Sequence, residues 1–138
     1  MLDRRLIIEN TAAVRAALTK RHADTDSHAA VDRIVEMDGR RKTVTTETDD
    51  LRAKRNTLSK QIGPLMREGK QAEAEPLKAE VKAFGDRLSA LEEELKSIED
   101  EQAQLLLSIP NLLDDRVPEG KTEDDNEVVR TWGEPNPL

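Results

Sequence analysis

Residues 74–105, AEPLKAEVKAFGDRLSALEEELKSIEDEQAQL, carry the pattern that decides the fold. Spacings of three and four alternate along this stretch, and they select a series that is apolar at every place but one. The series is Ala74, Leu77, Val81, Phe84, Leu88, Leu91, Leu95, Ile98, Gln102 and Leu105. Such spacing puts all members on one stripe of a helix, and a stripe sustained over several heptads is typical of a coiled coil.

A second series with the same spacing precedes the first. It comprises Ile34, Met37, Arg41, Val44, Thr48, Leu51, Arg55, Leu58, Ile62 and Leu65. If the chain folds back near Gly69, the two series face each other in antiparallel register, so that Leu51 meets Leu88 and Ile62 meets Leu77. The sequence therefore predicts an all-α fold, a long antiparallel two-stranded coiled-coil hairpin. At the rise of an α-helix, this arm would be roughly 50 Å long.

The flanking segments are predicted to be shorter and less regular. Residues 1–27 hold short N-terminal helices, one of which runs through AAVRAALTK at 12–20 with Asn10 or Thr11 as its cap and Val14 and Leu18 on its apolar face. The arm occupies 28–107, with Asp26 or Ser27 capping its first helix. Residues 108–138 form an extended linker in which 127–132, EVVRTW, is a possible short strand.

Two prolines, Pro64 and Pro76, lie close to the predicted tip of the arm. Proline cannot donate a backbone hydrogen bond and clashes with the preceding helical turn, whereas it is tolerated in the first turn. We therefore expect the first arm helix to kink or stop near Gly63, ahead of Pro64, and the second to begin near Pro76. The tip, about 63–75, would then be a loose cap rather than a tight turn.

Composition excludes several other classes of protein. Charged residues make up 37% of the chain and aromatic residues only 1%, which disfavours a compact globular core. The absence of cysteine removes any disulfide framework. The N-terminus carries charges at once and resembles no signal peptide, and no apolar run approaches the roughly 20 residues that span a bilayer. The sequence predicts a soluble, cytoplasmic protein that does not enter a membrane.

Charge is distributed unevenly along the predicted arm. The chain has a formal charge of −7, yet residues 52–87 contain nine basic and five acidic residues, whereas 32–50 and 88–105 together contain five basic and twelve acidic ones. A positive distal rod suits a polyanion, and acid at the base would repel that polyanion. The simpler alternative is a solvated charged face on a structural coiled-coil module that binds protein and has no nucleic-acid role.

Base stacking and metal binding have weaker support in the sequence. The single Phe lies on the seam, so no aromatic residues interleave with the basic ones, and any nucleic acid would be contacted through its backbone and shape. His22 and His28 are too few for a metal site. Trp132 could anchor an interface or be partly buried in the linker. The sequence shows no nucleophile with a base, no glycine-rich phosphate-binding loop and no paired carboxylates, so the chain alone is not expected to catalyse a reaction.

Several stretches, in order, resemble the N-terminal region of seryl-tRNA synthetase. They are LDRRLIIENTAAVRAAL at 2–18, LRAKRNTLSKQIG at 51–63, LLLSIPNL at 105–112, VPEG at 117–120 and EDDNEVVRTWGEP at 123–135. The resemblance covers nearly the whole chain. Leu113 and Asp114 stand where the family often has Pro and His, and Pro64 and Pro76 are not typical of it.

The resemblance implies a tRNA-binding arm that performs no chemistry itself. It implies that the arm lies between the long variable arm and the elbow of a serine tRNA bound mainly by the other subunit of a homodimer. A catalytic domain of the same enzyme, using ATP and Mg²⁺, would follow the linker; this chain itself has no class II ATP-binding motif and no cofactor is expected in it. The residues that the resemblance assigns to tRNA contact are Arg52, Lys54, Arg55, Lys60, Arg67, Lys70, Lys78 and Lys82.

Overall fold

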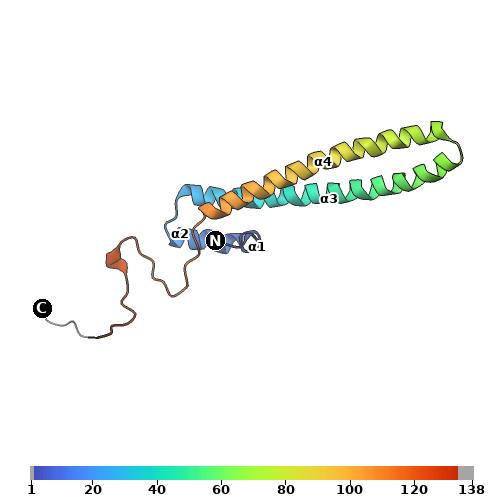
Figure 1. The fold of residues 1–138 in the computed structure, drawn as a ribbon. Helices are drawn as coiled ribbons and strands as arrows, with labels where there is room; N and C mark the ends of the chain where they lie inside the picture. Colours follow the sequence, from blue (N-terminus) through green and yellow to red (C-terminus); the bar gives the residue numbers. More distant parts are fainter. Residues whose placement is uncertain (1, 134–138) are drawn as a thin grey trace.

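The computed structural model describes residues 2–133, and its regular structure there is entirely helical (Figure 1). The elements are α1 (Arg4–Glu9), α2 (Thr11–Lys20), α3 (Thr25–Arg67), α4 (Gln71–Ser108) and the 3₁₀ turn η1 (Glu123–Asp125). α3 and α4 run side by side in opposite directions as one long arm, and α1 and α2 lie beside its base (Figure 1). The prediction of an all-α helical hairpin is confirmed.

The seam of the hairpin follows the two predicted series. Every member of both series is buried or half-buried, and Val44 and Leu91 are fully buried. An ion pair beside the seam agrees with the predicted register. Arg40 precedes the seam residue Arg41, Glu94 precedes the seam residue Leu95, and the two side chains pair across the two helices. Such pairing between flanking positions is what an antiparallel coiled coil produces.

The base of the arm holds a second apolar cluster that includes the N-terminal helices. Its buried members are Leu2, Ile7, Val14, Leu18, Ala30, Val31, Ile34, Leu106 and Ile109. Gln102, the polar member of its series, is buried at the same level. Its Nε2 donates to the Ile34 carbonyl at 3.3 Å, and its Oε1 accepts from Arg4 Nη1 at 3.3 Å. The polar residue thus links α1 to both helices of the arm.

The start of α3 differs from the sequence prediction. Asp24 is the N-cap, with extended backbone, and its Oδ1 accepts from the Ser27 backbone N at 2.8 Å and from Ser27 Oγ at 2.6 Å. The prediction of Asp26 or Ser27 as the cap is therefore wrong, because both are already inside the helix. α2 follows Asn10 as predicted, although the Asn10 side chain makes no capping hydrogen bond.

The tip is also tighter than predicted. α3 continues through Pro64 to Arg67, and α4 begins at Gln71, ahead of Pro76. Of the two alternatives for the first helix, a kink or a stop near Gly63, the stop is therefore wrong, and so is the predicted start of the second helix near Pro76. Both prolines lie within two turns of a helix end and are exposed, so water can reach the carbonyl that each leaves unbonded. Gly69, with φ of 73°, makes the reversal in the left-handed conformation that favours glycine.

Beyond α4 the chain is extended and lies largely in solvent. The possible strand at 127–132 does not form, because no neighbouring strand exists among residues 2–133 to pair with it. Trp132 is 89% exposed, so of its two predicted alternatives partial burial in the linker is wrong. Arg21 Nη1 donates to the Asn111 carbonyl at 2.9 Å and ties the start of this segment to α2. No helix in the described part of the chain is long and apolar enough to cross a membrane.

Candidate nucleic-acid interface

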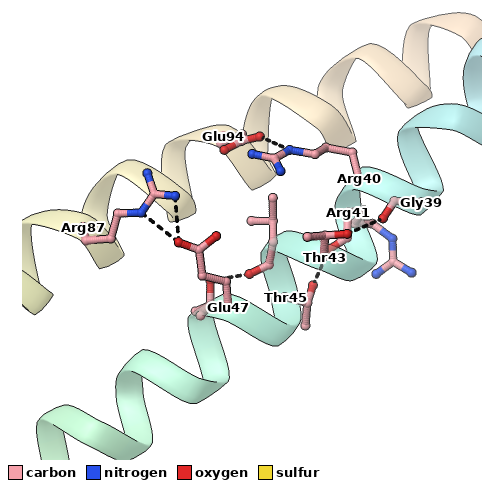
Figure 2. Close-up of polar contacts among 10 residues, drawn as sticks. Gly39, Arg40, Arg41, Thr43, Thr45, Glu47, Arg87 and Glu94 are labelled. Atoms are coloured by element: carbon pink, nitrogen blue, oxygen red, sulfur yellow. Dashed lines mark hydrogen bonds and ion pairs between the residues drawn. The ribbon is translucent and has the colours of Figure 1, made fainter.

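At the base of the arm, basic side chains are held by acidic ones. Arg40 Nε lies 2.6 Å from Glu94 Oε1, and Arg33 Nε lies 2.9 Å from Glu101 Oε1, each pair joining α3 to α4. Figure 2 shows the Arg40–Glu94 pair and, farther along the arm, Arg87 donating twice to Glu47. The hydrogen bond to Glu94 raises the pKa of Arg40, and the same bond lowers the pKa of Glu94. These cations are already neutralised within the protein.

The charge balance of the base is therefore acidic. Within residues 2–133, Lys96 is the one basic residue of 32–50 and 88–105 without an ion pair, whereas four acidic residues there have none. Those four are Asp50, Glu93, Glu99 and Asp100. A polyanion approaching this half of the arm would meet unpaired negative charge.

The distal half of the arm shows the opposite balance. Of the nine basic residues in 52–87, four form ion pairs: Arg52, Lys70, Lys78 and Arg87. In the part of the chain that the structure describes, the other five have no ion pair: Lys54, Arg55, Lys60, Arg67 and Lys82. Three acidic residues of the stretch, Glu73, Glu80 and Asp86, are likewise without one. The surplus is positive and is shared by α3 and α4.

The eight basic residues singled out from the sequence thus fall into three groups. Lys54, Lys60, Arg67 and Lys82 are exposed and make no ion pair among residues 2–133. Arg55 is half-buried on the seam. Arg52 and Lys70 are exposed and Lys78 is half-buried, and all three are held by ion pairs, with Glu92 at 2.9 Å, Glu68 at 2.9 Å and Glu75 at 3.0 Å respectively. The first group is the one whose charge is available to a ligand without breaking an existing contact.

A second basic group lies at the base and was missed in the sequence. Arg4 and Arg5 of α1 line an open groove of about 350 Å³ together with Asp38, Arg41 and Lys42 of α3. Asp38 is buried and lies 2.9 Å from Lys42 and 3.2 Å from Arg41, so part of this charge is compensated internally. The adjacent basic residues at 4–5 and 40–42 were the available signal, but only the packing of α1 brings them together.

The histidines do not converge. His22 lies in the turn after α2 with a φ of 54°, and His28 lies in the first turns of α3. Among the described residues, no group of three His, Cys, Asp or Glu side chains is placed to hold a metal ion.

Comparison with known proteins gives one consistent result. A family model described as "Seryl-tRNA synthetase N-terminal domain" matches residues 1–113. Proteins named serine–tRNA ligase from Zymomonas mobilis subsp. mobilis, Pseudothermotoga lettingae and Hahella chejuensis are 42%, 38% and 41% identical over 98%, 98% and 96% of the chain. The chain spans 31%, 31% and 30% of those relatives' lengths.

A solved structure shares the arrangement of the helices. The crystal structure of seryl-tRNA synthetase from Pyrococcus horikoshii complexed with ATP superposes with a TM-score of 0.86 at 32% identity. The match covers 96% of this chain and 29% of that one.

Proposed function

This chain belongs to the seryl-tRNA synthetase N-terminal domain family, and we propose that it is the tRNA-binding arm of a serine–tRNA ligase. In this role the arm recognises a serine tRNA by the shape of its long variable arm and elbow. The rest of the enzyme, a catalytic domain that uses ATP and Mg²⁺, attaches serine to that tRNA. We expect this enzyme to work as a homodimer in the cytoplasm.

One observation carries the assignment of RNA contact to this chain. In 32–50 and 88–105, among the described residues, every basic side chain but Lys96 is paired with an acidic neighbour, whereas Lys54, Lys60, Arg67 and Lys82 in the distal half have no ion pair within residues 2–133. A cation that is already paired must lose its partner before it contacts a phosphate, and an unpaired one need not. The distal half is therefore the part of the arm best suited to a phosphate backbone.

The geometry of the arm fits recognition by shape. α3 has 43 residues, which corresponds to about 65 Å of helix, so the distal cations lie far from the N-terminal helices (Figure 1). An elongated arm with charge on two helices can follow a groove or lie between two RNA helices, but it reads few base edges. Structured RNA is commonly recognised in this way, through its backbone and overall shape.

A paired substitution tests this proposal. Replacing Lys60 and Arg67 by Ala should weaken binding of a serine tRNA. It should also make the negative slope of log K against log salt shallower by about 2, because each phosphate contact contributes about one unit to its magnitude. Binding is measured by fluorescence anisotropy over a range of salt concentrations.

The matched control removes the same charge elsewhere. Lys96 and Lys121 are exposed and, within residues 2–133, have no ion pair, so replacing both by Ala should leave the salt slope unchanged. Equal weakening by the two double variants would show that net charge alone governs binding and would refute the distal contact.

A further inference from the structure

A shallow groove opens on the distal half of the arm, beside the single Phe of the chain. It has a volume of about 310 Å³ and lies between α3 and α4. Its lining residues are Ala53, Lys54, Thr57, Leu58, Glu80 and Phe84. The volume falls at the lower end of the range for small-molecule sites, about 300–1,000 Å³.

The groove exists because the seam does not close at this level. The register places Arg55 of α3 opposite Phe84 of α4, and a guanidinium with no ion pair in the described part of the chain is costly to bury. Ala53 and Thr57 are too short to cover the ring. Phe84 and Leu58 remain half-buried, as do most seam residues of the distal half, whereas Leu91, two seam positions nearer the base, is fully buried.

We propose that this groove receives one unpaired nucleobase of the bound RNA, stacked on the Phe84 ring. The inference rests on the proposed function and extends it, since it adds a base contact to an arm otherwise expected to read backbone and shape. Charge favours this occupant: the apolar floor lies within the basic half of the arm, and Lys54 at the rim can meet the phosphate of a base placed on the ring.

Glu80 limits which bases fit. A carboxylate accepts hydrogen bonds and donates none, so a base edge that faces Glu80 must carry N–H groups. Guanine presents such donors on its Watson–Crick edge, so the groove should prefer an unpaired guanine.

Three variants of the chain separate stacking from simple packing. Phe84→Leu keeps an apolar side chain on the seam but removes the ring, and it should weaken binding of a serine tRNA by about 5- to 10-fold. Phe84→Tyr keeps the ring and should bind within about twofold of the unsubstituted chain. In the third variant Phe84→Trp is combined with Trp132→Phe, so that the only indole lies in the groove. Its fluorescence should be quenched by the tRNA in the same titration that raises the anisotropy.

The outcomes also separate this inference from the proposed function. If the unsubstituted chain does not bind the tRNA at low salt, the proposed function fails and the inference fails with it. If that chain binds but Phe84→Leu binds equally well and the indole is not quenched, the inference alone is overturned. Equal losses in Phe84→Leu and Phe84→Tyr would mean that Phe84 acts through packing, which also overturns it.

Discussion

Asp38 shows how a single buried charge is accommodated in the arm. Its side chain is 4% exposed, and it faces Lys42 at 2.9 Å and Arg41 at 3.2 Å, in a groove also lined by Arg4, Arg5 and Glu9 of α1. Burial alone would raise the pKa of Asp38, but the hydrogen bonds from Lys42 and Arg41 outweigh burial and lower it. The folded state therefore favours the ionised carboxylate.

This lowered pKa predicts a pH dependence of stability. A carboxyl whose pKa is lower in the folded than in the unfolded state stabilises the fold above its unfolded pKa, and that contribution is lost as the pH falls through the folded pKa. Asp38→Asn should thus be less stable at neutral pH, and its free energy of unfolding should fall less steeply below about pH 4. Urea unfolding at several pH values measures both. Asp50→Asn, at an exposed position with no ion pair among residues 2–133, is the control; identical pH profiles for Asp38→Asn and the unsubstituted chain would contradict the account.

At the scale of the element, the seam holds the two long helices together. Leu91 is fully buried and belongs to the same apolar cluster as Met37, Val44 and Ile98, so it receives contacts from both helices. The ion pairs that join α3 to α4 beside the seam are largely exposed, and exposed pairs contribute only about 0–1 kcal/mol each. The apolar stripe, rather than the ion pairs, should determine the stability of the arm.

Leu91→Ala tests that ranking. Removing a buried leucine side chain should lower the free energy of unfolding by about 2–5 kcal/mol, because the lost burial and the cavity add. Ser97→Ala, at an exposed position of the same helix, should change it by less than about 0.5 kcal/mol. Thermal or urea unfolding followed by circular dichroism gives both values. A Leu91→Ala variant as stable as Ser97→Ala would show that the seam is placed wrongly.

The elements could be predicted well from the sequence where a periodic pattern was long. The seam positions followed from the heptads because a register error by one residue would expose the whole stripe. The helix ends did not follow, since Asp24, Asp26 and Ser27 can all cap a helix and only the backbone conformation selects Asp24. The prediction from the prolines was wrong because the free-energy cost of proline applies to a helix interior. Pro64 and Pro76 lie near exposed helix ends, where that cost is smaller.

The sign of the charge at the candidate site could be predicted from the sequence, but the contacts of its individual side chains could not. The basic excess of 52–87 was visible in the sequence. The pairing of Arg52 with Glu92 was not, because the two residues meet only once α3 and α4 are in register. The groove beside Phe84 likewise depends on how Ala53 and Thr57 are set against the ring, which periodicity does not determine.

At the scale of the whole molecule, shape and charge act together. The chain carries a formal charge of −7, but its base and its distal half differ in the sign of their unpaired charge. An extended arm with a positive far half and a negative base would hold a polyanion away from the N-terminal helices. The net charge of the chain therefore does not describe its distal half, where the unpaired charge is positive.

The most direct test of the central claim is fluorescence anisotropy of this chain with two RNAs at low and moderate salt. One is a serine tRNA with its long variable arm, and the other is the same tRNA with that arm deleted. The account predicts tighter binding to the intact tRNA and an affinity that falls steeply as salt rises. Equal binding of the two RNAs, or no binding of either at low salt, would contradict the claim that this arm reads the shape of a serine tRNA.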